Sequence, residues 1–242
     1  MATVTLPARR AAAPKPRAWE PLKLWRRRVA SRIMRARVRT RDFSIISNDC
    51  FGGMAYEELG MRYESPFVGL FIVPEDYIRL LRNLRSAMEE SITFRDRSQH
   101  EHINQFRSEI QCEYPIGVIG ENVEIQFLHY PTREQAAEKW QRRAARINWN
   151  KLRVKMGWHE QPHMDELLRE FDAMPFDSKL IVAPHAIAGT QHCVALRDFS
   201  TDGTQQYWRV HKAFDVAAWL DRGEVRRATW GRALDVPLYW HY

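Results

Sequence analysis

The seven residues from Ser47 to Gly53 bring a hydroxyl, an amide, a carboxylate and a thiol into one short segment. They follow an apolar run that starts at Phe43, as is typical of a buried strand that ends in a loop. The glycine pair lets the backbone approach a ligand closely, and the start of the next helix offers amide groups and a positive dipole to an anion. We therefore expect a substrate-binding loop formed by Ser47, Asn48, Asp49, Gly52 and Gly53.

The thiol in this loop, Cys50, has two interpretations. At the start of a helix its pKa can be lowered, which would make it a catalytic nucleophile. A free cysteine is also often a small buried hydrophobic residue, and the glycines would then only turn the chain. Both interpretations stay open at the level of sequence.

His129 stands where a predicted strand over Val123 to Leu128 ends. A histidine in such a place suits a general base or a hydrogen-bond donor to substrate. Alternatively, it is a partly buried, hydrogen-bonded residue. No neighbouring Asp or Glu in the sequence identifies a partner for it.

Four basic residues recur at helical spacing after Thr132, and they would form one cationic face opposite Trp140. Guanidinium groups bind phosphates in bidentate fashion, which suits a nucleotide sugar, a coenzyme A derivative or a lipid phosphate. The alternative is a solvated face supported by an ion pair between Glu138 and Arg142. The four residues are Lys139, Arg142, Arg143 and Arg146.

The string His159 to His163 matches the H-E-x-x-H pattern of zinc proteases. That pattern needs both histidines on one helical turn, and Pro162 interrupts the turn or marks the first residue of a new helix. We therefore expect no metal site.

Strand-like and helix-like segments alternate along the chain. This alternation favours an α/β fold with a largely parallel sheet and helices on both faces, a Rossmann-like three-layer arrangement. We expect strands at 43–47, 67–73, 116–119, 123–128, 152–156 and 179–182, and helices at 54–59, from Pro74, from Thr132, at 164–171 and at 214–220. Residues 92–114 carry no clear pattern. Because ligands in such sheets lie at the carboxyl ends of the strands, chemistry is expected after Ser47, Leu128 and Val182.

The net charge of +7 is unevenly distributed over the 242 residues. Residues 1–41 hold 13 of the 37 Lys and Arg and one acid, so this arm carries +12 and the rest of the chain −5. We expect a disordered tail over 1–18, a basic amphipathic helix over 19–41 and a single α/β domain over 42–242. Since the basicity belongs to the arm and not to the body, a nucleic-acid partner is not expected.

The apolar stripe Leu22, Trp25, Val29 and Ile33 of the predicted basic helix could lie in the interface of an anionic membrane. Equally, it could pack on its own domain. The three cysteines are far apart and odd in number, and no apolar run is long enough to span a bilayer, so we expect a cytoplasmic protein, peripheral to the membrane if it binds one.

Several separated motifs resemble a bacterial family commonly labelled exopolysaccharide or capsule biosynthesis proteins. The resemblance runs from about Asp42 to Pro184, with a weaker match at 219–221. Its marks are the runs 43–53, 63–67, 114–117 and 127–130 and the residues Glu138, Lys139, Trp140, Arg142, Arg143, Arg146, Ile147 and Asn148. Asp49 and Phe51 depart from the Asn and Trp expected there, and residues 185–212 match nothing.

The resemblance implies an α/β domain that builds or modifies a surface polysaccharide. It also implies that the 47–53 loop, Ser65, His129 with Tyr130, and the Lys139 to Arg146 face form one site. A strand that ends in Asn-x-Cys is distantly similar to the coenzyme A-binding start of another capsule family. We expect a transferase that moves an acyl or glycosyl group from a coenzyme A derivative or nucleotide sugar to a polysaccharide precursor, with His129 and Cys50 as catalytic residues. The alternative is a non-catalytic module that binds a sugar phosphate or recruits polysaccharide enzymes.

Overall fold

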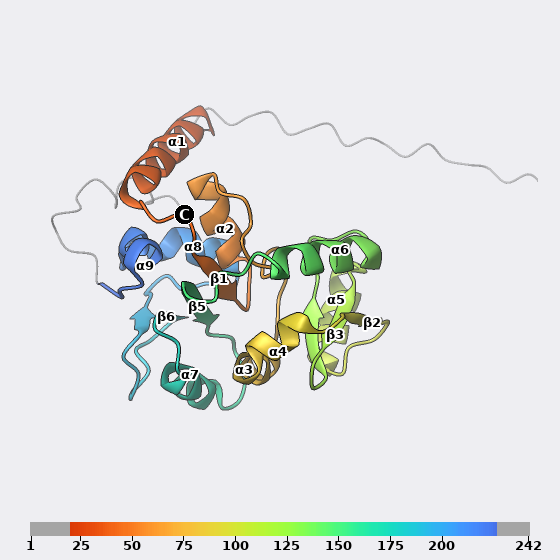
Figure 1. Ribbon diagram of the computed structural model, residues 1–242. Coiled ribbons are helices and arrows are strands. Elements are labelled where there is room, and N and C mark those ends of the chain that lie inside the picture. Colours follow the sequence, from red (N-terminus) through yellow and green to blue (C-terminus); the bar gives the residue numbers. More distant parts are fainter. Residues whose placement is uncertain (1–19, 227–242) are drawn as a thin grey trace, which may run out of the picture.

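The computed structural model describes residues 20–226 (Figure 1). The predicted tail over 1–18 and the end of the predicted domain, 227–242, lie outside the described residues. The first described element is helix α1, Glu20–Arg37, which lies across one side of the molecule.

The centre of the fold is a sheet of four parallel strands in the order β1-β5-β6-β7. The strands are β1 (Ser44–Ser47), β5 (Leu152–Gly157), β6 (Lys179–Ala183) and β7 (Cys193–Ala195). Every residue of β1 and β6 is buried. A strand covered on both faces reads as a continuous run rather than an alternating one, which explains the apolar stretches in the sequence.

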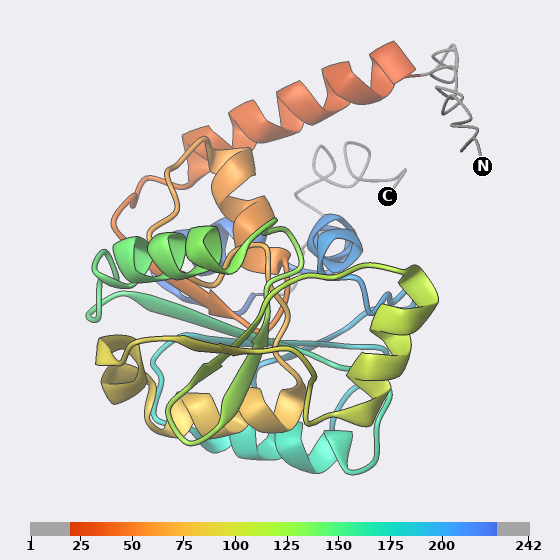
Figure 2. The ribbon, with the colours of Figure 1, turned by 90° about the vertical axis from the view of Figure 1, so that its right-hand side faces the viewer.

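Helices cover both faces of this sheet (Figures 1 and 2). On one face lie α2 (Phe51–Leu59), α8 (Gly203–Val210) and α9 (Val216–Arg222), and on the other α3 (Pro74–Arg82) and α7 (Met164–Ala173). Neighbouring strand residues enter different cores, as the two-residue period of a strand requires. Ile45 packs in the cluster with α2, α8 and α9, whereas Ile46 packs in the cluster with α3 and α7.

A second, antiparallel sheet of three strands adjoins the first core. It consists of β2 (Thr93–Arg95), β3 (Ile116–Ile119) and β4 (Val123–Gln126). Around it lie α4 (Leu84–Glu89), α5 (Glu101–Ile110) and α6 (Arg133–Ala144). Thr132 caps α6 by accepting the Gln135 amide, and Trp140 packs at 5.5 Å from Phe67 and 5.9 Å from Phe127, measured between ring centroids.

The structure confirms the α/β class and corrects its details. The strand order does not reverse beside β1, as it does in doubly wound nucleotide-binding sheets, so the finer Rossmann-like expectation gains no support. The predicted strand over 67–73 is wrong. That segment makes only the isolated bridge between Phe71 and Gln126, because Gly69 turns the chain at φ +70°. Its apolar residues reflect burial rather than pairing in a sheet.

Other elements were missed or misplaced in the sequence. The unpatterned residues 92–114 contain β2 and α5, and residues 185–212 contain β7 and α8. Helix α7 begins at Met164, so Pro162 precedes the helix and is not its first residue. Strands β3 and β4 form an antiparallel pair and do not join the parallel sheet.

Helix α1 packs on α2 and α9 with Ala30 and Met34 buried, and Val38, directly after the helix, is buried as well. The predicted apolar stripe is therefore displaced from the buried face. Val29 and Ile33 are half-buried, and Trp25 is exposed. Within residues 20–226, no helix has the length and apolar character needed to cross a membrane.

Candidate functional site

A cleft of about 410 Å³ lies where α2, α6 and the loop after β4 meet. Six residues that the sequence indicated contribute to its lining. They are Cys50, Gly53, His129, Tyr130, Lys139 and Arg143. Segments far apart in the chain thus converge on one hollow.

The loop after β1 is held by its own side chains. The Ser47 hydroxyl donates to the Asp49 carbonyl (2.9 Å) and accepts the Gly52 amide (3.3 Å), and Asp49 Oδ1 accepts the Phe51 amide (3.0 Å). A Cβ atom at Gly52 would lie 2.9 Å from Ser47 Oγ, so this close approach needs glycine. These bonds cap the start of α2 and fix Cys50 as its N-cap residue.

Behind the cleft lining, the same loop is joined to β5 through buried polar groups. Asn48 Oδ1 accepts the Gly157 amide at 3.0 Å, and Asp49 pairs with Lys155, which also donates to Gln206 Oε1 at 2.8 Å. Burial lowers the pKa of Lys155, whereas Asp49 opposes that shift. Ser47, Asn48, Asp49 and Gly52 therefore lie behind the lining and position the loop.

Cys50 and His129 form a side-chain pair in the cleft. Cys50 Sγ lies 3.6 Å from His129 Nε2, and the His129 amide donates to the Gly69 carbonyl at 3.1 Å. Burial raises the pKa of Cys50 to about 12, with further contributions from the carboxylates of Asp49 and Asp202. The resting thiol is therefore protonated at neutral pH. A nucleophilic thiolate requires proton transfer to His129.

The first turn of α2 presents one amide to the same cleft. The Met54 amide bonds the Cys50 carbonyl, and the amides of Phe51 and Gly52 are capped by side chains. The Gly53 amide has no acceptor among the residues that the structure describes. An amide at a helix N-terminus, next to a thiol, can bind the oxygen on which negative charge develops during acyl transfer.

Arg143 contributes a buried positive charge to the cleft wall. Its residue is 9% exposed, and Nη1 donates to the Tyr130 hydroxyl at 2.6 Å. The guanidinium lies 4.6 Å from the centroid of the Tyr63 ring. In the described part of the chain, no carboxylate forms an ion pair with it. A guanidinium keeps its charge when buried, so an anionic ligand would supply the missing counter-charge.

Lys139 lies on the same wall, one turn before Arg143 on α6. Its ammonium group is 5.3 Å from the centroid of the Tyr130 ring, and it makes no ion pair within residues 20–226. The Tyr130 hydroxyl donates to the Val68 carbonyl at 2.7 Å, and burial raises the pKa of this tyrosine. Tyr130 thus stays neutral and holds the two cations in place.

The remaining candidates lie away from the hollow. Arg142 is exposed and paired with Glu138 at 3.5 Å, as the alternative interpretation of this face expected. Arg146 donates to the Tyr63 carbonyl at 3.2 Å, and the buried Ser65 hydroxyl donates to the Ile45 carbonyl at 2.5 Å. These two residues fix the position of the segment that forms the cleft wall.

Three polar residues of the cleft, Glu57, Tyr63 and Thr204, were not among the candidate site residues. Glu57 accepts a hydrogen bond from the Tyr63 hydroxyl at 3.1 Å, and both side chains line the hollow. Glu57 is four residues after Gly53 on α2, so helical periodicity alone could have identified it. Thr204, from α8, also lines the cleft, but nothing in the sequence connects it to the loop.

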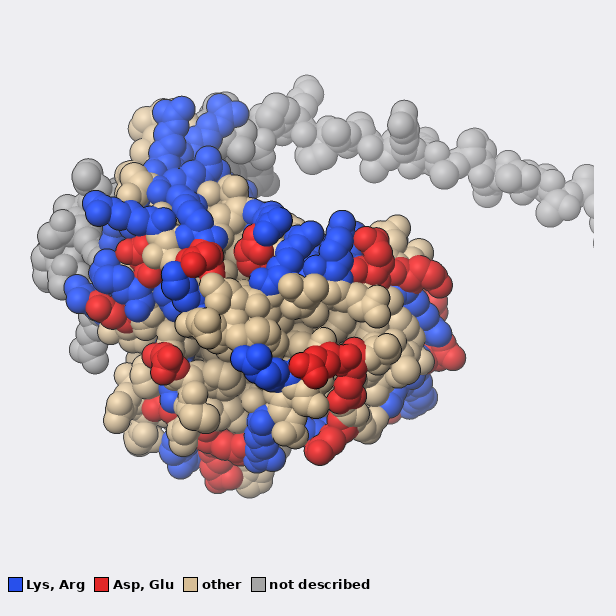
Figure 3. Space-filling model, in the orientation of Figure 1, with Lys and Arg blue, Asp and Glu red and all other residues tan. Residues whose placement is uncertain are grey.

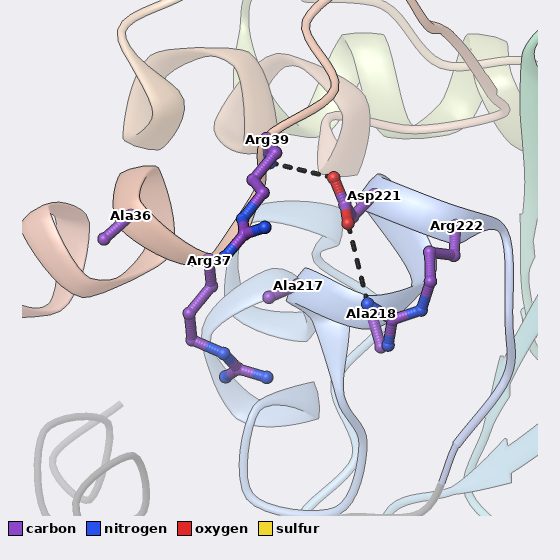
Figure 4. A pocket seen from close by; sticks show the side chains of 7 residues that line it. All are labelled: Ala36, Arg37, Arg39, Ala217, Ala218, Asp221 and Arg222. Atoms are coloured by element: carbon purple, nitrogen blue, oxygen red, sulfur yellow. Dashed lines mark hydrogen bonds and ion pairs between the residues drawn. The ribbon is translucent and has the colours of Figure 1, made fainter.

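A second hollow, of about 450 Å³, lies between α1 and α9 (Figure 4). Arg37, Arg39 and Arg222 face it, but carboxylates accompany them. Arg37 pairs with Asp215 at 2.7 Å, and Asp221 accepts the Arg39 amide at 2.8 Å. Arg222 also pairs with Asp221, at 3.6 Å, so two of the three guanidinium groups are paired within the protein, and we interpret this hollow as a joint between the two helices.

The histidines of the H-E-x-x-H string have separate surroundings. His159 packs at 4.9 Å from Phe71, and burial lowers its pKa to about 4. His163 is exposed and precedes α7 in a left-handed conformation. In residues 20–226, no group of three or more His, Cys, Asp or Glu is placed to hold a metal ion.

The comparisons with known proteins agree on a family without an assigned activity. An uncharacterized protein of Haemophilus influenzae is 28% identical over 153 residues, which cover 62% of this chain and 66% of the relative. The chain thus spans slightly less than two thirds of that relative's length. The family model described as "Domain of unknown function (DUF1919)" matches residues 22–221, and the chain therefore belongs to the DUF1919 family.

Proposed function

We propose that this protein is an acyltransferase that uses a phosphate-bearing donor. The observation that carries the proposal is the buried guanidinium of Arg143, which forms no ion pair within residues 20–226 and lies in a cleft that also holds the Cys50 and His129 pair. A buried cation selects an anionic ligand, and a thiol beside a histidine favours acyl over glycosyl transfer.

In the proposed first step, Arg143 and Lys139 bind phosphate groups of a coenzyme A thioester. Cys50 Sγ attacks the acyl carbon while His129 takes the thiol proton. The bond from the acyl carbon to the leaving sulfur breaks, and His129 returns the proton to that sulfur. The product is a thioester on Cys50. In the tetrahedral intermediate that precedes it, the Gly53 amide would bind the negatively charged oxygen.

In the second step, a hydroxyl of the acceptor attacks this thioester. His129 accepts the hydroxyl proton and passes it to the departing Cys50 sulfur, so that an ester is released and the thiol is restored. Glu57 and the Tyr63 hydroxyl offer an acceptor and a donor in the same cleft, which suits a sugar with several hydroxyls. A surface-polysaccharide precursor as acceptor rests on the sequence resemblance, whereas a cytoplasmic site of action rests on the three widely spaced cysteines.

Binding is tested by thermal stability of the full chain with acyl-coenzyme A, nucleotide sugars and polyprenyl phosphates. A ligand at about 100 times its dissociation constant adds about 2.7 kcal/mol, or roughly 5 to 10 °C in Tm for a chain of this size. We expect acyl-coenzyme A to raise the Tm of the wild type and of Arg142→Gln but not of Arg143→Met. A shift with nucleotide sugars alone would replace acyl transfer with glycosyl transfer.

Chemistry is tested by mass spectrometry after mixing with acyl-coenzyme A. We expect an acyl group on Cys50 that is absent in Cys50→Ala and slow to form in His129→Gln. Binding without any acylation would support the second candidate, a non-catalytic module. The raised pKa of Cys50 favours that candidate, because a thiol that stays protonated is a poor nucleophile.

A further inference from the structure

The outer edge of α1 combines apolar exposure with positive charge. Trp25 is 59% exposed, and Val29 and Ile33 follow it at four-residue intervals as half-buried residues. An exposed tryptophan buries little apolar area within its own domain. Such a residue is typically found where another surface covers it. Its amphipathic ring suits the interface between lipid headgroups and acyl chains.

Arginines flank this apolar edge without being neutralised by the domain. Arg28 and Arg32 are exposed, and neither takes part in an ion pair in the described stretch of the chain. Arg35 donates to the Glu58 carbonyl at 3.0 Å rather than to a carboxylate. Unpaired arginines beside an aromatic residue complement a surface that is anionic at its headgroups and apolar beneath them.

The positive charge continues from α1 to α6. The Arg35 guanidinium lies against Gly60, and Arg146, two residues after the end of α6, reaches the same connecting segment at Tyr63. Figure 3 shows the Lys and Arg side chains gathered over α1 and again over α6 on one face of the molecule. We name this surface the basic face and define it by Trp25, Arg28, Arg32, Arg35, Arg142 and Arg146.

We propose that the basic face docks on an anionic lipid bilayer, with Trp25 in the headgroup region. Because α1 is fixed to α2 and α9 by Ala30, Met34 and Val38, only its outer edge is free to enter the interface. A nucleic acid is the weaker fit, since phosphate tracking makes no use of Trp25, Val29 and Ile33, and residues 42–242 carry a net −5. The proposal does not depend on the chemistry of the cleft.

The test is co-sedimentation of the full chain with phosphatidylcholine vesicles, with and without phosphatidylglycerol. We expect binding only to the anionic vesicles. Removing two charges in Arg28→Gln/Arg32→Gln lowers the partition constant about 25-fold, from about fivefold per arginine. Trp25→Ser lowers it about tenfold, because the ring loses its apolar contact. Residues 1–19 are retained in every variant, so their basic charges are constant.

Matched controls lie elsewhere on the molecule. The first control, Arg82→Gln/Arg169→Gln, removes the same charge from exposed residues on α3 and α7, across the sheet from α1 and α2. The second control, Phe106→Ser, removes the other large exposed hydrophobic residue of the described chain, which lies on α5 and is 47% exposed. We expect both controls to bind as the wild type does. The proposal would be overturned by equal losses of vesicle binding in the control variants or by equal binding to neutral vesicles. It would also be overturned if the Arg28→Gln/Arg32→Gln variant lost binding to duplex DNA while its binding to the vesicles was unchanged. Circular dichroism confirms that the variants are folded.

Discussion

Two of the regions that hold buried charges in this molecule, the junction of α3 with the antiparallel sheet and the cleft, differ in how those charges are partnered. At the junction of α3 with the antiparallel sheet, Asp76 and Glu124 are fully buried, and both carboxylates accept hydrogen bonds from neighbouring donors. Asp76 accepts from Arg79, His100 and the Glu124 amide at 2.9 Å each, and Glu124 accepts from Arg95 at 2.7 Å. In the cleft, the buried Arg143 side chain donates to the Tyr130 hydroxyl and has no carboxylate partner within residues 20–226.

Whether a buried charge has a complete set of partners distinguishes a structural site from a binding site. A buried charge whose partners are complete holds the fold together and has nothing left to offer a ligand. A buried charge without an opposite charge reduces the stability of the empty protein and binds the ligand that neutralises it. Removing a buried charged side chain is therefore expected to destabilise the protein at the junction but not in the cleft.

The largest effect is expected at the junction. Asp76→Ala leaves Arg79 and His100 without their acceptor and should lower the free energy of unfolding by about 3 to 5 kcal/mol. Urea denaturation followed by circular dichroism measures this value. A loss below about 1 kcal/mol would mean that the junction is not a completed network and would remove the contrast with the cleft.

Arg143→Met should have the opposite effect on stability. Removing a buried cation that lacks a counter-charge is expected to leave the free energy of unfolding unchanged or to raise it by about 1 kcal/mol, while the anionic ligand is lost. The same denaturation experiment, with phosphate-bearing ligands added and omitted, measures both effects. A strong destabilisation of the ligand-free protein would make Arg143 a structural residue.

The junction also predicts a pH dependence. The hydrogen bond to Asp76 raises the pKa of His100 above its usual 6.5. The stabilisation from protonated His100 is therefore complete below about pH 6.5 and is lost as the pH rises through the higher pKa of the folded state. Denaturation midpoints at several pH values should show this loss in the wild type and not in His100→Gln. The difference should be of the order of 1 kcal/mol or less, since His100 is partly solvated.

The smallest effect is expected at Arg142, next to Arg143 in the sequence. Arg142→Gln breaks only the exposed pair with Glu138 and should change stability by less than about 0.5 kcal/mol, with ligand affinity preserved. Denaturation and the thermal shift assay check both parts. A loss of ligand here comparable to that of Arg143→Met would extend the binding surface out of the cleft.

Elements with strong local signals were predictable, whereas elements that depend on distant contacts were not. Helix α6, with its Thr132 cap and Trp140 stripe, was identified because its signals are local. Strand β7 has three residues, and helix α8 is stabilised by contacts with distant residues such as Phe51, whose ring is 5.0 Å from Tyr207. Such contacts leave no pattern in the local sequence.

The candidate site shows the same limit. Chain order and residue types indicated Cys50, His129 and Arg143, and the cleft contains all three. Helical spacing placed Arg142 and Arg143 on one face, but it could not tell which of them is buried. That distinction depends on Tyr63 and Tyr130, which lie before α6 in the chain and fold against it.

The buried pair between Asp49 and Lys155 has a consequence for the order in which the site forms during synthesis. Lys155 completes its contacts only with Gln206, and the cleft wall only with Thr204, both on α8. Most of the chain has therefore been synthesised before either residue leaves the ribosome. Until then the nascent chain holds a lysine inside the parallel sheet with one partner missing, and the Phe51 side of α2 is uncovered. We therefore expect the incomplete chain to need chaperones during synthesis. We also expect a chain truncated before α8 to aggregate rather than to fold into a smaller functional protein.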